Sequence, residues 1–215
     1  MVNDMIVQLF TVGELLTNCY VVSCEQTREA IIIDPGFDDS HEAEKVFRYI
    51  SEKSLTLKFV LNTHGHPDHT CGNGIVKGKF NVPILIHEFD APMLGERGKR
   101  VAEFFGFRSF SPKPDITLHD GALIEFGKVT LKVMHTPGHS LGGISLIGDK
   151  EVFTGDTLFL GSIGRTDFPE SSEQDMMVSL KKLAALPDHF IVYPGHGPIT
   201  TIGEEKRNNP FLKGL

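Results

Sequence analysis

The segment VLNTHGHPDHTCGN, residues 60–73, places three histidines and one aspartate within six positions, directly after an apolar run. His64 and His66 are two residues apart, so in an extended segment their side chains point to the same side and could grip one metal ion together. Asp68 and His69 follow a proline that redirects the chain, so they are better placed for a second ion. Four residues of ligand type rarely gather in six positions by chance. We therefore interpret this segment as a metal-binding loop.

Three other stretches share the same layout of a β-rich run followed by a turn that carries histidine or aspartate. They are KVMHTPGHS (132–140), EVFTGDT (151–157) and IVYPGHG (191–197). If the four strands lie side by side, their carboxyl ends gather seven candidate ligands at one edge. The seven are His64, His66, Asp68, His69, His139, Asp156 and His196.

The chemistry of this set favours a catalytic centre with two adjacent divalent metal ions that share one carboxylate. Imidazole and carboxylate suit zinc, iron or manganese, and zinc is our first expectation. The set contains no cysteine, which disfavours a structural zinc site. A catalytic site keeps an open coordination position, where a bound water is activated near neutral pH. We interpret the other histidines as ordinary surface or core residues: His41, His87, His119, His135 and His189.

Composition limits the remaining possibilities. A chain of 215 residues with 40% apolar and 23% charged residues is typical of a globular protein, and we expect one domain over residues 1–215. The net charge of −7 disfavours a nucleic-acid-binding surface. Neither a membrane span nor a secretory leader is evident. Three cysteines are too few for a disulfide framework, so we expect a reduced cytoplasmic protein.

Local patterns predict a layered α/β domain. Strands are predicted at 5–10, 19–23, 30–34, 57–62, 82–87 and 190–193, with hairpins at 122–135 and 143–155. A helix is predicted over 40–53 with Ser40 as its N-cap, and another over 171–186 with Ser172 and Asp175 as a capping box. Residues 91–115 have no clear period and are interpreted as an irregular surface excursion. Cys71 is interpreted as a small residue opening the next helix.

The chain resembles the metallo-β-lactamase superfamily, whose motif reads His-x-His-x-Asp-His. The resemblance runs from NCYVV and IIIDPG through THGHPDH, HTPGHSLGG and FTGDTLF to YPGHGP. It implies an αββα sandwich with the metal ions at one edge of two β-sheets. It also implies that His64, His66 and His139 bind a first metal, that Asp68, His69 and His196 bind a second, and that Asp156 bridges them.

Within the superfamily, FTGDTLF, GRTDFP and YPGHGP are similar to glyoxalase II enzymes, thioesterases that hydrolyse S-D-lactoylglutathione. This resemblance implies attack by a metal-bridging hydroxide on the thioester carbonyl. Asp68 and Asp156 would be the catalytic carboxylates, with Asp68 orienting or deprotonating the attacking water. Asp156 stands where class B β-lactamases typically place a cysteine, which argues against antibiotic hydrolysis. Asp34 is either an orienter of the histidine loop or a polar residue beginning a turn.

The sequence departs from full-length glyoxalase II in its substrate-binding parts. Only 19 residues follow His196, so we expect this chain to lack the C-terminal helical domain of those enzymes. Arg165 occupies the position of a lysine that contacts the glycine end of glutathione, and Asp167 replaces a usual tyrosine. Arg165 could still bind a substrate carboxylate. The phenylalanines of the 91–115 segment form either an apolar wall of the substrate cleft or a cover for the sheet edge.

Two alternatives stay open. Persulfide dioxygenases share the GRTDF stretch and use a single iron, which would be bound here by His64, His139 and Asp156. A lactonase or another ester hydrolase would use the same hydroxide chemistry. The expected partner is a small-molecule thioester, with glutathione as a candidate carrier. An exposed strand edge or the phenylalanine-rich segment could also support a homodimer.

Overall fold

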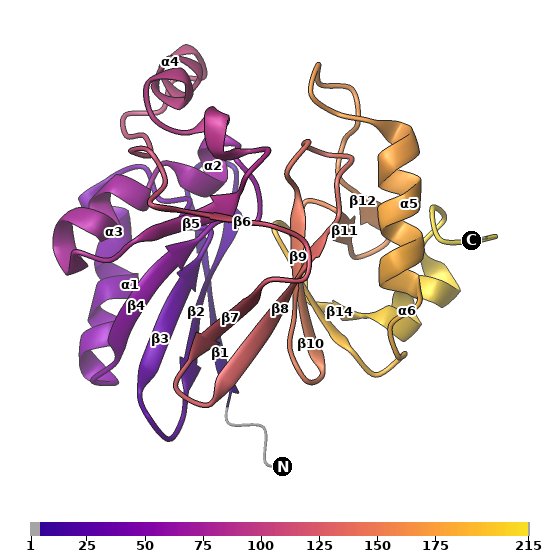
Figure 1. The fold of residues 1–215 in the computed structure, drawn as a ribbon, viewed down its shortest axis with the longest axis horizontal. Coiled ribbons are helices and arrows are strands. Elements are labelled where there is room, and N and C mark those ends of the chain that lie inside the picture. Colours follow the sequence, from indigo (N-terminus) through magenta and orange to yellow (C-terminus); the bar gives the residue numbers. More distant parts are fainter. Residues whose placement is uncertain (1–4, 215) are drawn as a thin grey trace.

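Two six-stranded β-sheets lie face to face, with helices on the outer side of each sheet (Figure 1). The structure is a computed structural model that describes residues 5–214. Residues 1–4, on which the expectation about a secretory leader partly rests, lie outside the described residues. The predicted αββα sandwich is confirmed.

The first sheet has the strand order β1-β2-β3-β4-β5-β6. Its strands are β1 (Met5–Val12), β2 (Thr17–Cys24), β3 (Glu29–Ile33), β4 (Thr56–Leu61), β5 (Ile84–His87) and β6 (Ile116–Leu118). The first three strands pair antiparallel, and β3 to β6 pair parallel. The crossovers between the parallel strands carry α1 (Ser40–Glu52), α2 (Pro67–Thr70), α3 (Asn73–Phe80), a 3-10 turn (Ala91–Met93) and α4 (Glu96–Phe104).

The second sheet has the order β14-β13-β10-β9-β8-β7. Its strands are β7 (Leu123–Phe126), β8 (Val129–His135), β9 (Ile144–Ile147), β10 (Glu151–Gly155), β13 (Ile191–Pro194) and β14 (Thr200–Thr201). A separate ribbon pairs β11 (Leu158–Phe159) with β12 (Ser162–Ile163). The outer face is covered by α5 (Glu173–Ala184) and α6 (Ile202–Asn208) (Figure 1). In the part of the chain from residue 5 to 214, no helix has the length and apolar character needed to cross a bilayer.

The buried apolar residues form three layers, one between the two sheets and one on the outer side of each sheet. A strand can contribute to two of these layers, because successive side chains of a strand point to opposite faces. Ile31 and Ile33 of β3 pack between the two sheets, where they meet Leu131 and Phe153 of the second sheet. Their neighbour Ile32 packs against α1 on the other side. A third apolar cluster lies between the second sheet and α5 with α6. Central strands such as β3 are therefore buried on both faces, and only their ends are available for a polar site.

Two helix starts differ in detail from the prediction. The N-cap of α1 is Asp39 and not Ser40, because the extended Asp39 accepts hydrogen bonds from the backbone N–H groups of His41 and Glu42. Ser172 does cap α5 by accepting from the N–H of Asp175. The backbone N–H of Ser172 donates to the carbonyl of Gly138, so the capping residue also ties the start of α5 to the loop that carries His139.

The prediction of an irregular segment over 91–115 was wrong, because this segment contains α4. Ala102 is the only buried residue of that helix, so no apolar stripe marked it in the sequence. Cys71 does not open α3 but follows α2 as its C-cap, with its thiol directed to the carbonyl of Phe37.

Two stacked imidazoles, one from each sheet, lie in contact where β5 and β8 end. His87 ends β5 and His135 ends β8, and their ring centroids are 4.3 Å apart at an interplanar angle of 7°. Burial, followed by the neighbouring His135, lowers the pKa of His87 to about 4. Between about pH 4 and pH 6.5, His87 is therefore neutral in the folded protein and protonated in the unfolded chain.

We expect this pair to make stability fall with acid. Below the unfolded pKa of about 6.5 the unfolded state binds a proton that the folded state refuses, so stability is lost as the pH falls from 6.5 towards 4. His87→Phe keeps a ring but removes the titration. Its free energy of unfolding, measured in urea at pH 7.5 and pH 5, should fall less than that of the wild type. The exposed His189→Phe is the control, and an identical fall in all three proteins would contradict this prediction.

Candidate metal centre

The predicted ligands gather at one edge of the sandwich, as four loops that follow β4, β8, β10 and β13 (Figure 1). In the second sheet β8 and β10 both pair antiparallel with β9, and β13 pairs parallel with β10. These three strands therefore run in the same direction and end at the same edge. Loops on that edge meet the His64–His69 loop from the first sheet.

Three groups of three residues bring their ligand atoms within 4.8 Å of one another, and two of these groups match the predicted ligand sets, the third being Asp34, His64 and His69. The first group is His64, His66 and His139, and the second is Asp68, His69 and His196. In the first group His66 Nδ1 lies 2.9 Å from His139 Nε2. In the second group His196 Nε2 lies 3.1 Å from His69 Nε2 and 3.2 Å from Asp68 Oδ2. Each group is compact enough to hold one cation.

Asp156 lies between the two groups. Its Oδ2 is 3.4 Å from His139 Nε2, and its Oδ1 is 3.4 Å from His69 Nε2. Asp156 Oδ1 and His64 Nε2 are buried and make no hydrogen bond to any described residue. Leaving such atoms unpaired costs free energy unless another ligand satisfies them. These two atoms point to a cation as the missing partner.

Each of the five histidines has one ring nitrogen that faces away from the other ligands, here called the outer nitrogen. This nitrogen already lies within hydrogen-bond distance of another group of the protein. The rings of His69 and His196 hydrogen-bond through Nδ1 to Asp34 Oδ2 at 3.0 Å and to the Leu15 carbonyl at 3.1 Å. His139 Nδ1 donates to the Arg165 carbonyl at 2.9 Å.

The two remaining rings follow the same rule. His64 Nδ1 lies 3.1 Å from the Thr63 hydroxyl, and His66 Nε2 lies 3.2 Å from Glu170 Oε1. An imidazole that donates from one nitrogen presents a lone pair at the other. All five inner nitrogens are therefore left free for metal, so the donor set fits divalent cations.

Asp34 orients the histidine loop, as one of our two interpretations proposed. Its carboxylate accepts from the N–H of Thr63 at 2.7 Å, from the Thr63 hydroxyl at 2.6 Å and from His69 Nδ1. Because the Thr63 hydroxyl donates to Asp34, it is free to accept from His64 Nδ1–H. One buried carboxylate thus aligns a ring in each group.

Asp90 has a comparable role that sequence reasoning missed. This fully buried residue accepts from the N–H of Gly65 at 2.9 Å, the Ser140 hydroxyl at 2.7 Å and the N–H of Gly142 at 2.6 Å. It therefore ties the His64–His66 turn to the His139 loop. The available signal was its position shortly after the buried run ILIH, which parallels the position of Asp34 directly after Ile31–Ile33.

The electrostatics of the centre favour ionised carboxylates, neutral rings at His64 and His139, and protonation at His69 and His196, whose pKa values are raised. Burial alone would raise the pKa values of Asp68 and Asp156, but the neighbouring His69 lowers both. Burial lowers the pKa of His64 well below its usual value, and it also lowers that of His139. Burial opposes protonation of His69, yet the surrounding carboxylates, first Asp156, raise its pKa. The two ionised carboxylates therefore attract positive charge, which in the metal-free protein is a proton on His69 or His196 and which a bound cation would replace.

The predicted substrate residue Arg165 lies at the rim on the segment between β12 and α5. Its side chain is 58% exposed and forms a bidentate pair with Asp167 at 2.7 and 2.8 Å. The guanidinium also lies 4.2 Å from the ring centroid of Phe168, which in turn packs against His66.

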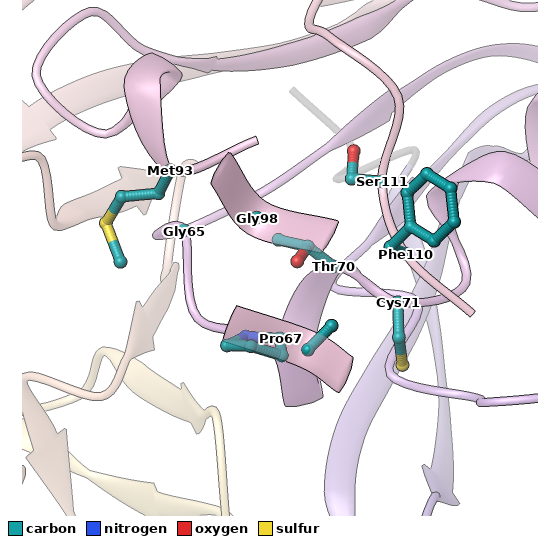
Figure 2. Close-up of a pocket in the computed structure, with 9 residues that line it drawn as sticks. Gly65, Pro67, Thr70, Cys71, Met93, Gly98, Phe110 and Ser111 are labelled. Carbon is teal, nitrogen blue, oxygen red and sulfur yellow. The ribbon is translucent and has the colours of Figure 1, made fainter. Parts of the chain in front are cut away.

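The phenylalanines of the 91–115 segment differ in exposure, and their role as a cleft wall or a sheet cover stays a prediction. Phe104 and Phe105 at the end of α4 are 84% and 61% exposed. Phe110 lines a small pocket beneath α4, together with Pro67, Thr70 and Met93 (Figure 2). This pocket lies against the back of the histidine loop and not among the ligand atoms.

The metallo-beta-lactamase superfamily model matches residues 12–196. An uncharacterized protein of Mycobacterium tuberculosis is 40% identical over 226 residues, which cover 98% of this chain and 99% of that protein. The hydroxyacylglutathione hydrolase GloC of Haemophilus influenzae is 37% identical over 217 residues, covering 97% of this chain and 98% of the relative.

The chain is also similar to solved structures over nearly its whole length. The BLEG-1 B3 metallo-beta-lactamase has a TM-score of 0.88 at 34% identity, covering 97% of this chain and all of that one. A di-iron-bound form of TTHA1623 has a TM-score of 0.82 at 36% identity, with 96% and 100% coverage. ETHE1 from Myxococcus xanthus has a TM-score of 0.79 at 29% identity, with 95% and 83% coverage.

Proposed function

This chain belongs to the metallo-beta-lactamase superfamily, and we propose that it hydrolyses a thioester of the S-D-lactoylglutathione type. The coarser activity, metal-dependent hydrolysis, follows from its family. The observation that carries the proposal is the centre itself, in which five engaged imidazoles and two ionised carboxylates aim at one small volume. The similarity to a hydroxyacylglutathione hydrolase over nearly its whole length supports the thioester as substrate.

We assign His64, His66 and His139 to a first metal, Asp68, His69 and His196 to a second, and Asp156 to both. Zinc is the expected metal, and the di-iron form of a similar protein keeps iron as an alternative. Bound there, two divalent ions would supply a water of lowered pKa and a Lewis acid for the carbonyl oxygen.

The chain itself supplies orientation and proton handling. Asp68 stays ionised, because His69 and His196 lower its pKa against the effect of burial. Its carboxylate can therefore accept a hydrogen bond from the attacking water and hold one lone pair of that water towards the substrate. The departing thiol has a pKa of about 8.5, so it leaves as a thiolate with little help from an acid. No separate general acid is needed for this reaction.

Arg165 is proposed to bind a carboxylate of the substrate, in competition with Asp167. Arg165→Ala should raise KM for S-D-lactoylglutathione about fivefold with kcat unchanged, because an exposed ion pair contributes ~1 kcal/mol at most. Asp167→Ala should lower KM, since it releases the guanidinium from its present partner. Steady-state kinetics check both variants, and unchanged KM in the pair would remove Arg165 from substrate binding.

The deciding experiment measures metal content per chain by elemental analysis on the sample used for turnover. Close to two ions per chain with cleavage of S-D-lactoylglutathione would support the proposal. One iron per chain, no thioester cleavage and oxygen uptake with glutathione persulfide would support the dioxygenase alternative instead. A lactone and a chromogenic cephalosporin complete the substrate set, the latter because a similar structure is a B3 metallo-beta-lactamase. Selective cleavage of the lactone or of the cephalosporin would show that the substrate is not a thioester.

A further inference from the structure

The segment from Gly164 to Ser172 packs directly on two histidines of the first group. Its Arg165 carbonyl accepts from His139 Nδ1, and its Ser171 hydroxyl donates to the His139 carbonyl at 2.7 Å. The Phe168 ring lies 5.2 Å from the His66 ring, centroid to centroid. This segment therefore holds the first group from its outer side.

We propose that Glu170, on this segment, is a positioning residue that holds His66 in the orientation needed to bind metal. Glu170 Oε1 lies 3.2 Å from His66 Nε2, on the side of the ring opposite to His139. A carboxylate only accepts hydrogen bonds, so this contact requires the proton of the imidazole to be on Nε2. The lone pair is then on Nδ1, which lies 2.9 Å from His139 Nε2 and faces the first group.

Glu170 is distinguished from the other outer partners by its location. Asp34 and Thr63, which engage His69 and His64, are buried and belong to the core of the loop. The partners of His139 and His196 are backbone carbonyls that no substitution removes. Glu170 is 30% exposed, so its side chain can be replaced without opening the core. Its removal thus isolates the effect of one outer contact on one ligand.

Metal affinity tests this role directly. The inference rests on the proposed metal binding, so zinc and cobalt are titrated into the metal-free protein in competition with a chromophoric chelator. Glu170→Ala should weaken one of the two metal sites about 10- to 100-fold, the usual effect of losing an outer partner of a ligand. Glu170→Gln should stay close to the wild type, because its amide oxygen still accepts from Nε2–H. The visible spectrum of the cobalt protein should change in Glu170→Ala alone.

The matched control is Glu173→Gln, an exposed glutamate three residues along the chain, and thermal unfolding checks that all variants fold. If Glu170→Ala binds both metals as tightly as Glu173→Gln, the positioning role is overturned. Equal weakening in Glu170→Gln and Glu170→Ala would also overturn it, since charge and not acceptance would then matter. If the wild type itself binds no metal, the proposed function fails and this inference with it, a result distinct from the other two.

Discussion

Asp156→Asn is expected to lower turnover of S-D-lactoylglutathione at least ~10³-fold, beyond the roughly 10- to 100-fold typical of losing an outer partner of a ligand. Asparagine has the same shape but no charge, so the packing around this buried residue is preserved. The two groups would lose a carboxylate that they share, with its oxygens 3.4 Å from His139 Nε2 and from His69 Nε2. The metal content of the purified variant should fall together with its turnover.

The control for Asp156→Asn is Asp149→Asn, the same change in the exposed turn between β9 and β10. Its activity and metal content should match the wild type. Thermal unfolding of the metal-free proteins checks that Asp156→Asn still folds. Turnover within tenfold of the wild type in Asp156→Asn would contradict our assignment of this residue to both metals.

Asp34→Ala is expected to destabilise the metal-free protein by about 3–5 kcal/mol, the usual cost of breaking a buried charged pair. Three buried donors, two from Thr63 and one from His69, would lose their common acceptor. The backbone adds to this cost, because Asp34 has φ of +49°, a left-handed conformation that aspartate and asparagine tolerate better than alanine. Urea unfolding of the metal-free protein measures the loss without any contribution from bound metal.

Asp34→Asn serves as the comparison for Asp34→Ala, since it keeps one acceptor oxygen and the preference for the left-handed conformation. It should lose clearly less stability. A loss below ~1 kcal/mol in Asp34→Ala would show that the network around Thr63 rearranges, and our account of its alignment would then be wrong.

The strands and the turns that end them were the parts of the fold that could be predicted from the sequence. Strands such as Glu29–Ile33 were recognisable because apolar β-branched residues ended at a turn. The α4 helix was not predicted, because it buries a single alanine and its sequence therefore lacks the hydrophobic pattern that indicates a helix. The start of α1 shifted by one residue because both Asp39 and Ser40 can cap, and only the backbone conformation selects between them.

The sequence by itself determined the residue types of the centre and their spacing along four loops, because ligand chemistry resides in side chains that can be read one by one. The tertiary structure decided how the ligands are aimed. His196 is engaged by the carbonyl of Leu15, 181 residues away, and His66 by Glu170, 104 residues away. A backbone carbonyl has no signature in a sequence, and a glutamate on a surface segment resembles any other. Orientation thus depends on contacts that exist only once the two sheets have packed together.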